Sequence, residues 1–431
     1  MKQEIKERIE KIRNGEVPEG YRKTKVGIIP EEWDVKPLEK EIDLLTGFPF
    51  PSNQYSKDGV KLLRGSNVKR GETDWTDENT KYWKSVTSEL KQYVLNEGDI
   101  VIAMDGSLVG RSFARLSNKD LPALLLQRVA RVRSNHIDMG YLKEFICSDY
   151  FTRYCDTAKT ASSIPHISPK DIKNFKIPLP PTRAEQQKIE EILSSWDKAI
   201  ELKEKLIEEK KEFKRGLMQK LLTGKVRFPE FTDDWKEFQL KDICKFMKGS
   251  GLSKEKLSIN GKKKCILYGE LYTTYSEVIQ EVISKTNIVE GVPSQKGDVL
   301  IPASTTTSGI DLANATAIEE NSVLLGGDIN ILRNDKSLFN SSFLAYYLTH
   351  IKKFDIARKA QGITIIHLYG EHLKKIQVNI PQVQEQEKVA QVISIQNDEI
   401  EILTKKLFQL NEQKKGLMQL LLTGIVRAEV D

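Results

Sequence analysis

One segment of this chain occurs twice, and it limits what the chain can fold into more than any other feature. Residues 214–227 read KRGLMQKLLTGKVR, and residues 414–427 read KKGLMQLLLTGIVR. The match continues upstream without a gap, because PTRAEQQKI from Pro181 aligns with PQVQEQEKV from Pro381 at the same spacing of 200 positions (416 − 216 for the shared glycine). A chain that repeats itself at a fixed long period is two copies of one unit, related by a pseudo-twofold axis. The repeat therefore predicts a duplicated molecule.

The two copies of the segment each end a long predicted helix. Residues 183–222 and 384–422 lack proline, are rich in Glu, Lys, Gln, Leu and Ile, and place apolar residues at alternating spacings of three and four. This spacing is typical of a coiled-coil seam, and two such helices in one chain can pair antiparallel. A Thr-Gly pair follows each helix, and glycine is the residue preferred at a helix end.

The regions between the helices carry short, mixed signals. Strand-like runs such as GDIVIAMDGS and GDVLIPASTTTSG are broken by Gly, Asn, Asp and Ser, and helical stretches follow them. We therefore predict an α+β protein with two tandem α/β domains separated by two long antiparallel helices. The expected segments are an N-terminal helix that packs with the C-terminal region (1–17), a first domain (18–181), a central helix (182–224), a second domain (225–381) and a C-terminal helix (382–431).

Each domain begins with a segment that contains an aligned tryptophan. VGIIPEEWDVKPLEKEI resembles VRFPEFTDDWKEFQLKDI, so that Trp33 aligns with Trp235. Large aromatic side chains at such positions are usually buried, and we expect both to be structural anchors. Because the second copy ends where the first leads into this segment, the pattern is circular, with both chain ends expected beside the helices.

The composition indicates a soluble globular protein with a mild basic excess. The chain of 431 residues is 39% hydrophobic and 30% charged with a net charge of +6, which is compatible with a polyanionic partner but does not establish one. No apolar run approaches the ~20 residues of a membrane span, and the N-terminus lacks the apolar core of a signal peptide. Four scattered cysteines without a C-x-x-C pair predict ordinary thiols, no metal site and a cytoplasmic protein.

Catalytic motifs are absent from the sequence. There is no G-x-x-x-x-G-K-[ST], G-x-G-x-x-G, G-x-S-x-G or H-E-x-x-H, and no Asn/Asp-Pro-Pro-aromatic tetrapeptide of the adenine methyltransferases. Asp99, Asp105 and Asp298 could be read as carboxylates of an active site, but turn residues at strand edges explain them better. We therefore expect no catalytic residue and no cofactor on this chain.

The repeated helices and their flanks carry a resemblance to a known family. EQQKIEEILSSWDKAI followed by KRGLMQKLLTG, EQEKVAQVISIQNDEI followed by KKGLMQLLLTG, and the segments ILYGELYTTY and LLGGDINILR together resemble the specificity (S) subunits of type I restriction-modification systems. The first domain has KLLRGSNVKRG in place of ILYGELYTTY. The resemblance implies two target-recognition domains, each reading one half of a split, asymmetric DNA site. It also implies that two modification subunits, which carry the S-adenosylmethionine chemistry, dock on the helices, and that restriction (motor) subunits join them.

Candidate DNA-binding residues are the polar and basic residues of loops that follow strands. Arg and Lys hold phosphates or guanine edges, and Ser, Thr, Asn and Tyr contact base edges or brace the backbone. For any one of them a solvated surface position is the alternative, and His166 and His367 are equally suited to shaping their loops. The candidates are Arg64, Ser66, Asn67, Lys69, Arg70, Ser107, Arg111, Lys159, Ser162, Ser163 and His166 in the first domain, and Lys262, Lys263, Lys264, Tyr272, Thr273, Tyr275, Ser304, Thr305, Thr306, Arg358, Lys359 and His367 in the second.

Candidate partner-docking residues are the polar residues repeated at both helix starts. Helix pairing within the chain does not require the same polar cluster twice, which favours docking, although pairing alone remains the alternative. Two other functions stay open at this point: a scaffold whose two domains bind protein ligands, and a self-sufficient methyltransferase. The docking candidates are Glu185, Gln186, Lys188, Glu385, Gln386 and Lys388.

Overall fold

The computed structural model describes residues 3–158, 165–334 and 337–429, and its contacts divide the chain into two compact units. Unit 1 consists of Met1–Leu202 and Leu407–Asp431, and unit 2 consists of Lys203–Lys406. The sequence analysis treated the two long helices as segments separate from the domains. The contacts instead assign one part of each helix to unit 1 and the other part to unit 2. Over the described residues, no helix is both long and apolar enough to cross a membrane.

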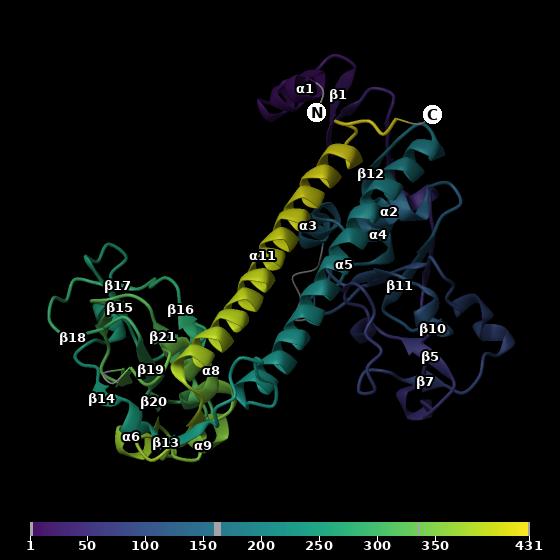
Figure 1. Ribbon diagram of the computed structural model, residues 1–431. Coiled ribbons are helices and arrows are strands. Elements are labelled where there is room, and N and C mark those ends of the chain that lie inside the picture. The colour runs from purple at the N-terminus through teal and green to yellow at the C-terminus, as the bar shows by residue number, and fades with distance from the viewer. Residues whose placement is uncertain (1–2, 159–164, 335–336, 430–431) are drawn as a thin grey trace. The chain divides into compact units, whose positions relative to one another are not determined.

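Two long helices are present, as the sequence predicts. They are α5 (Arg183–Leu222) and α11 (Val383–Leu422), and each has 40 residues (Figure 1). In each unit, the start of one helix lies against the end of the other, because Glu185 contacts Arg427 in unit 1 and Glu385 contacts Arg227 in unit 2. The helix segments within each unit therefore run antiparallel, which confirms the prediction.

Unit 1 is built on a five-stranded sheet with the order β4-β11-β8-β9-β6. The neighbours are antiparallel except for the parallel pair of β6 and β9. A three-stranded sheet (β10-β5-β7) and the pairs β1-β2 and β12-β3 complete the unit. The strands are β1 (Tyr21–Thr24), β2 (Gly27–Pro30), β3 (Asp34–Pro37), β4 (Asp43–Thr46), β5 (Val60–Leu63), β6 (Arg70–Gly71), β7 (Tyr82–Trp83), β8 (Ile100–Ala103), β9 (Phe113–Arg115), β10 (Ala123–Leu125), β11 (Val129–Arg133) and β12 (Lys176–Leu179).

Unit 2 repeats this topology. Its five-stranded sheet has the order β14-β23-β19-β21-β16, and again only the last pair is parallel. A four-stranded sheet (β17-β15-β22-β18) and the pairs β13-β25 and β20-β24 accompany it. The strands are β13 (Lys236–Gln239), β14 (Lys245–Lys248), β15 (Lys263–Ile266), β16 (Val278–Ile279), β17 (Lys285–Thr286), β18 (Val292–Pro293), β19 (Asp298–Pro302), β20 (Ser304–Thr305), β21 (Thr316–Ile318), β22 (Leu324–Leu325), β23 (Ile329–Arg333), β24 (Ile366–His367) and β25 (Gln377–Ile380).

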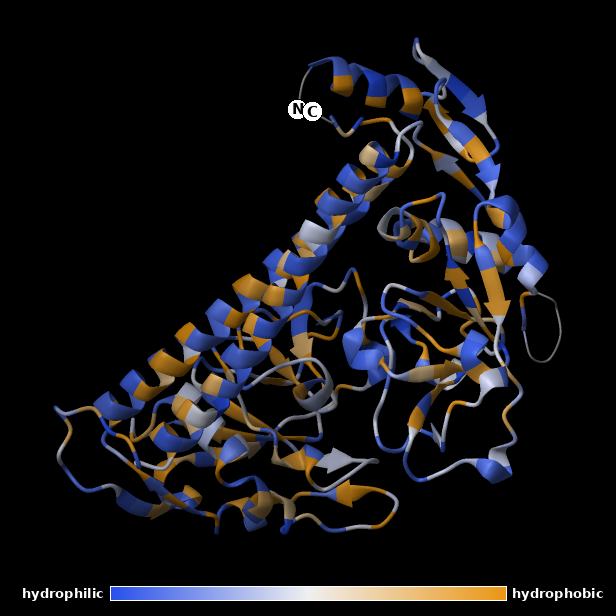
Figure 2. Cartoon of the chain, turned by 90° about the vertical axis from the view of Figure 1, so that its right-hand side faces the viewer, coloured by the Kyte–Doolittle hydropathy of each residue, from blue (hydrophilic) through white to orange (hydrophobic). Residues whose placement is uncertain are grey.

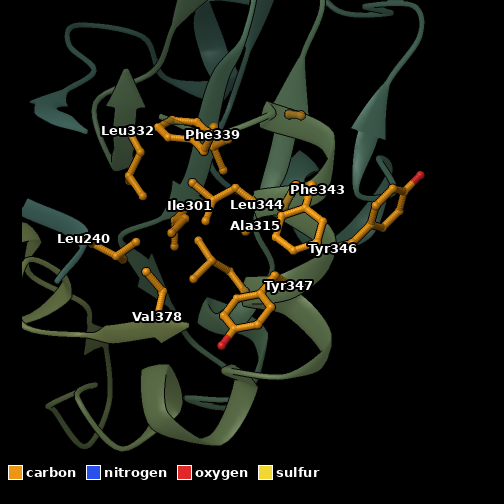
Figure 3. Close-up of a cluster of buried hydrophobic side chains, with 14 of the residues drawn as sticks. Leu240, Ile301, Ala315, Leu332, Phe339, Phe343, Leu344, Tyr346, Tyr347 and Val378 are labelled. Atoms are coloured by element: carbon orange, nitrogen blue, oxygen red, sulfur yellow. The ribbon is translucent and has the colours of Figure 1, made fainter. Parts of the chain in front are cut away.

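Shorter helices accompany the sheets. The bounds are α1 (Gln3–Arg13), α2 (Met139–Ile146), α3 (Asp149–Ala158) and α4 (Pro169–Asn174) in unit 1, and α6 (Leu240–Ile243), α7 (Glu270–Thr273), α8 (Ser341–His350), α9 (Lys353–Ala357) and α10 (Gly370–Leu373) in unit 2. In unit 2, Phe343, Leu344 and Tyr347 of α8 pack with Ile301 of the central strand β19 (Figure 3).

The central strand of each sheet is buried on both faces, which explains its continuous apolar sequence. Alternate side chains of a strand point to opposite faces. Accordingly, Ile100 and Ile102 of β8 belong to one apolar core, and Val101 and Ala103 belong to another. The predicted α+β class is confirmed in both units by this layering of sheet and helices.

The Thr-Gly pairs end both helices and bring them against the aligned tryptophans. Gly224 and Gly424 have φ of +69° and +68°, the left-handed conformation in which a side chain is strained. A Cβ atom on Gly424 would lie 3.1 Å from Cε2 of Trp33, and one on Gly224 would lie 3.2 Å from Cε2 of Trp235. Trp33 is fully buried, as predicted, whereas Trp235 is half-buried.

The N-terminal helix α1 packs on the last turns of α11. Arg8 donates a hydrogen bond of 2.9 Å to the carbonyl oxygen of Ile425, and its guanidinium lies 5.1 Å from the ring centroid of Tyr21. Ile9 and Ile12 of α1 line a hollow together with Leu420. In Figure 2, α1 is coloured mostly as hydrophilic, with hydrophobic residues at intervals along it. One apolar stripe of α1 therefore faces the end of α11.

Candidate nucleic-acid interface

The repeated Glu-Gln pair at each helix start holds that unit together. Nε of Arg427 lies 2.5 Å and Nη2 lies 2.7 Å from the two carboxylate oxygens of Glu185, and Arg227 makes the same two contacts with Glu385 at 2.9 and 2.8 Å. We call these two ion pairs the end clamps. The carboxylates are almost fully buried, with 4% and 1% of the side chain exposed. A buried charge needs such a partner, so that each clamp fixes the end of one helix to the start of the other.

The glutamines beside them fix a third helix in each unit. The Oε1 atom of Gln186 accepts a hydrogen bond of 2.9 Å from the backbone N–H of Asp138, the residue that caps α2. Gln386 accepts the same bond, also 2.9 Å, from Asn340, which caps α8. A structural task in both units thus explains why this polar pair is repeated.

The burial of these residues changes the interpretation of the predicted docking cluster. Glu185, Gln186, Glu385 and Gln386 are at most 5% exposed and are bonded within their own unit, so that their side chains are not available to a partner. Only the lysines of the predicted set, Lys188 and Lys388, lie on the surface, where they pair with Glu191 and Glu230. The Glu-Gln pair is repeated at both helix starts because it forms the internal contacts of each unit.

In unit 2, the structure brings two groups of predicted DNA-binding residues together. Strand β20 pairs antiparallel with β24, so that Ser304 lies opposite His367. Both β20 residues, Ser304 and Thr305, are buried, whereas Thr306 is exposed at the start of the next turn. The hydroxyl of Thr307 contacts the hydroxyl of Thr305 at 2.8 Å. The two loops therefore form one surface that follows the end of the central strand β19.

Arg358 and Lys359 lie on the same side of unit 2. They follow α9, which packs on the turn Asp311–Ala313, and both are exposed. Within the ranges that the structure describes, neither side chain forms an ion pair, whereas the nearby Asp311 is engaged by the hydroxyl of Thr307 at 2.5 Å. Unpaired cations beside exposed hydroxyls are suited to phosphate and base-edge contacts.

The equivalent surface of unit 1 is described in part. Asp105 forms an isolated β-bridge with His166, at the place of Ser304 and His367 in unit 2. The carboxylate of Asp105 lies 2.9 Å from Nη1 of Arg128, and Ser107 is exposed two residues later. The candidates Lys159, Ser162 and Ser163 lie outside the described residues.

Two of the other candidates in unit 1 have structural roles. Asn67 is fully buried and bonds the backbone at both ends of its own turn, at the N–H of Arg64 and the carbonyl oxygen of Asp74. The guanidinium of Arg64 donates to both oxygens of Asn79, and it therefore braces the same loop. The side chains of Arg64 and Asn67 are committed within unit 1, and Ser66 between them is exposed.

Lys69, Arg70 and Arg111 pair with carboxylates of their own unit. Lys69 lies 3.5 Å from Asp74, Arg70 lies 3.3 Å from Asp149, and Arg111 makes two bonds of 3.0 and 2.8 Å to Asp156. Arg70 and Arg111 also line one hollow with residues of the repeated segment on α11. They are therefore adjacent to the helix surface of unit 1.

The remaining candidates of unit 2 lie in two further loops. Lys262 and Lys263 are exposed, and Lys264 pairs with Glu320 at 2.9 Å. Tyr272 is half-buried and Thr273 is exposed, whereas the hydroxyl of Tyr275 accepts a hydrogen bond from the backbone of Ile283.

Three exposed side chains beside these loops escaped the prediction. Ile363 is 99% exposed, Ile365 is 49% exposed and Tyr369 is 52% exposed, all within the segment that contains β24. The sequence analysis searched loops for polar and basic residues, and isoleucines in the run GITIIHLYG resemble a buried strand. The glycine before them was the available signal, because it indicates a turn.

The aspartates considered as catalytic residues are internal supports in both units. Asp99 receives two hydrogen bonds from Arg133, and Asp298 receives two from Arg333 at 2.8 and 2.7 Å. Both carboxylates are at most 3% exposed. They fix the ends of the central strands. In addition, no three His, Cys, Asp or Glu side chains of the described residues gather where they could hold a metal ion.

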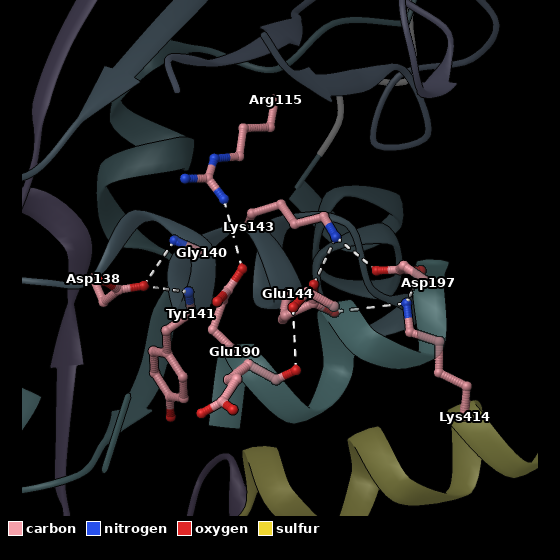
Figure 4. A network of polar contacts seen from close by, with 11 residues as sticks. Arg115, Asp138, Gly140, Tyr141, Lys143, Glu144, Glu190, Asp197 and Lys414 are labelled. Atoms are coloured by element: carbon pink, nitrogen blue, oxygen red, sulfur yellow. Dashed lines mark hydrogen bonds and ion pairs between the residues drawn. The ribbon is translucent and has the colours of Figure 1, made fainter. Parts of the chain in front are cut away.

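Unit 1 contains a charged network at the side of its helix pair (Figure 4). Lys143 of α2 contacts Glu144 at 2.7 Å and Asp197 of α5 at 3.0 Å, and Lys414 of α11 also contacts Asp197. Burial opposes the charge of Asp197, but both lysines outweigh it and hold the pKa of Asp197 below its usual value. Burial likewise opposes the charge of Lys143, but Glu144 and Asp197 raise its pKa above its usual value. Asp197 and Lys143 therefore both stay charged near neutral pH.

These features define a duplicated, two-domain protein whose helices are fixed by matched clamps and whose loops differ between the copies. The family described as the type I restriction modification DNA specificity domain matches residues 30–211 and 232–412. The chain therefore belongs to the family of type I restriction-modification specificity subunits. Specificity subunits are the non-catalytic members of such complexes, and this is the role of the chain.

Individual relatives agree with this assignment. The putative MjaX specificity subunit of Methanocaldococcus jannaschii is 26% identical over 95% of this chain and 97% of its own length. The MjaVIII specificity subunit of the same organism is 34% identical over 48% of this chain, and the match spans about half (49%) of that relative. The EcoAI specificity subunit of Escherichia coli is 32% identical over 41% of this chain and 30% of its own length.

A solved structure shares the fold. The S subunit of the type I restriction-modification system of M. genitalium superimposes with a TM-score of 0.56 at 17% identity, over 90% of this chain and 96% of that one. A chain from a structure described as the basis of complex assembly and conformational transition of the type I R-M system gives 0.57 at 15% identity, over 92% and 99%. The predicted fold is thus confirmed.

Proposed function

We propose that this chain reads a split DNA site, with the loops of unit 1 contacting one half and those of unit 2 the other. The observation that carries the proposal is the contrast between matched supports and unlike loops. The clamps and the sheet order are the same in both units, whereas the residues at equivalent loop positions differ, as with Asp105 and Ser304. Unlike side chains at equivalent positions recognise unlike base edges.

The same proposal assigns the outer surface of the helices to two modification subunits. Leu202 and Ile402, which occupy equivalent positions of the repeat, are 58% and 53% exposed. Apolar side chains that stay exposed at matched positions indicate a surface that a partner covers. Because the positions match, we expect each unit to bind one copy of the same partner.

Each unit also has a hollow that the repeated segment lines. The hollow of unit 1 is lined by Met418 and Gln419, and that of unit 2 by Met218 and Gln219, which are the same positions of the repeated segment. Met218 is 4% exposed and belongs to the core of unit 2, so the exposed Gln219 and Gln419 are the matched side chains that a partner can reach. We place S-adenosylmethionine on the modification subunits, and restriction subunits join the complex through them.

Reconstitution tests the function directly. The purified chain is mixed with the modification subunits, DNA and a labelled methyl donor, and the methylated sites are sequenced. We expect methyl transfer at one split sequence with all four components, and none when the modification subunits are left out. DNA binding by the complex should weaken log-linearly with salt, because phosphate contacts release counterions. Transfer by the chain alone, or methylation without a sequence preference, would contradict the proposal.

The helices are also proposed to set the gap between the two halves of the site. Four residues inserted into each of α5 and α11 lengthen a helix by about 6 Å. We expect the unread gap in the methylated sequence to widen by about one to two base pairs, since stacked base pairs rise ~3.4 Å each. An unchanged gap would show that the helices do not set the spacing.

A further inference from the structure

A small hairpin in unit 2 presents apolar side chains to solvent on a tightly fixed backbone. The backbone N–H of Gln361 donates to the carbonyl oxygen of His367 at 2.9 Å, and the N–H of His367 donates back to Gln361 at 2.7 Å. We call residues 361–367, closed by these two bonds, the Ile363 hairpin. Its tip carries Ile363, which is 99% exposed, and Ile365, which is 49% exposed.

The backbone of this hairpin is held from both sides. Gly362 has φ of +131°, and a Cβ atom on it would lie 2.0 Å from the carbonyl oxygen of Ile365, so that only glycine fits the turn. Behind the tip, the backbone N–H of Leu368 donates to Ala303 at 2.8 Å, and the side chain of Leu368 is 1% exposed in the core. The exposure of Ile363 is therefore built into the fold of unit 2.

Polar and charged groups surround the tip in an arrangement that fits DNA. The exposed cations Arg358 and Lys359 precede the hairpin in the chain, and the exposed hydroxyl of Thr306 follows the strand that pairs with it. On the other side, the rings of His367 and Tyr369 stack with centroids 6.0 Å apart. Cationic side chains bind phosphates, and hydroxyl groups form hydrogen bonds with base edges. Isoleucine can do neither, so Ile363 and Ile365 need an apolar group of the DNA as their contact.

We infer that the Ile363 hairpin enters the major groove and that Ile363 contacts the C5-methyl group of a thymine in the half-site read by unit 2. This inference rests on the proposed function. The major groove is about 12 Å wide and admits a two-stranded element, and the thymine methyl is the apolar group that a base pair displays there. Ile363 thereby contributes specificity for A·T pairs that polar side chains of the neighbouring loop cannot supply.

The test uses the complete complex with modification subunits and DNA that contains its mapped site. Deoxyuridine, which lacks the methyl group, replaces thymidine at each position of the unit 2 half-site in turn. For the unaltered protein, we expect one position to weaken binding about fourfold, the effect of one buried methyl group. The Ile363→Ser variant should bind the thymidine site on the order of tenfold more weakly and should not respond to deoxyuridine at that position.

A matched variant controls for the loss of an exposed isoleucine. Ile259 of unit 2 is 92% exposed in another loop, and Ile259→Ser should leave both binding and the deoxyuridine response unchanged. Neither substitution removes a buried group, so that both proteins should fold. If Ile363→Ser retains full discrimination, or if no position responds to deoxyuridine in the unaltered protein, the inference is wrong while sequence-specific binding stands. A complex without any sequence preference would instead overturn the proposed function on which the inference rests.

Discussion

In unit 1 the helix pair is joined to α2 by a charged network, whereas in unit 2 the equivalent place holds a neutral hydrogen bond. Asp197 of unit 1 accepts from Lys143 and Lys414, but its counterpart Asn397 donates one bond of 3.0 Å to the hydroxyl of Tyr346. Both arrangements satisfy their polar groups, so that either is compatible with the same backbone. The two copies of the repeat therefore have the same residues where these fix the helix ends, and different residues beside them.

The end clamps should give the largest effect in both units. Arg227→Met leaves the carboxylate of Glu385, which is 1% exposed, buried without a partner, and this should destabilise unit 2 more than any other substitution proposed for it. We expect this loss in the free energy of opening at the start of α11, measured by amide hydrogen exchange. Arg427→Met should cost at least as much in unit 1, because Arg427 also pairs with Glu32.

A surface arginine provides the control for the clamps. Arg215 lies near the end of α5, and its side chain is 73% exposed. Arg215→Met should therefore change the free energy of unfolding by no more than about 0.5 kcal/mol. If Arg227→Met is as mild as Arg215→Met, the clamps do not hold the helix ends. A double variant with Glu385→Leu should recover much of the loss, since the unpaired charge is removed.

Docking is expected to be equivalent in the two units. Leu202→Glu and Ile402→Glu each place a charge on the proposed docking surface. Each should weaken the binding of one modification subunit by about 2 kcal/mol or more. Mass measurement of the complex should then show one modification subunit in place of two. Val289, which is 73% exposed in a loop of unit 2, supplies the control variant Val289→Glu. Two bound subunits with either helix variant would contradict the docking surface.

The stability of unit 1 should depend on the carboxylate of Asp197, whereas unit 2 has no carboxylate at the equivalent position. Asp197→Asn removes the shared acceptor of two lysines, and we expect a loss of about 1–2 kcal/mol, moderated because Asp197 is partly exposed and Glu144 remains. In unit 2, Asn397→Ala should cost about 1 kcal/mol for one neutral hydrogen bond. Chemical denaturation monitored separately in each unit measures both changes.

Acid separates the two arrangements further. The pKa of Asp197 is lower in the folded than in the unfolded protein, so its contribution is present above the unfolded pKa of about 4 and is lost as the pH falls through the folded pKa. The difference between the original protein and Asp197→Asn should therefore be complete near pH 7 and should vanish in strong acid. The effect of Asn397→Ala should not follow this pattern. A pH-independent effect of Asp197→Asn would show that the network contributes only packing.

The smallest expected change in stability comes from position 420, which lies beside α1, compared with the equivalent position 220 of unit 2. Leu420 is half-buried beside α1, whereas its counterpart Lys220 is exposed in unit 2. Leu420→Lys should weaken the packing of α1 by about 1 kcal/mol and increase proteolysis between α1 and β1. Lys220→Leu should change neither unit by more than about 0.5 kcal/mol. Equal effects of the two substitutions would show that α1 does not depend on this contact.

The sequence was sufficient to predict the duplication, the two long helices and the burial of Trp33, because each depends on local spacing or on the repeat itself. It could not give the task of Glu185 and Gln186. Their partners, Arg427 and Asp138, are distant in the chain, so that a polar pair at a helix start has the same appearance whether it faces a partner or the interior. The exposure of Ile363 was hidden for a related reason, because only the hairpin closed by Gln361 and His367 keeps it out of the core.

Exchange of one set of loops tests the central claim most directly. Residues 46–180 of unit 1 are replaced by the corresponding segment of another specificity subunit, with the clamps and all of unit 2 retained. The sites methylated by the reconstituted complex are then sequenced. We predict that one half of the site changes while the other half and the gap between them stay the same. A site that changes in both halves, or in neither, would contradict independent reading by the two units.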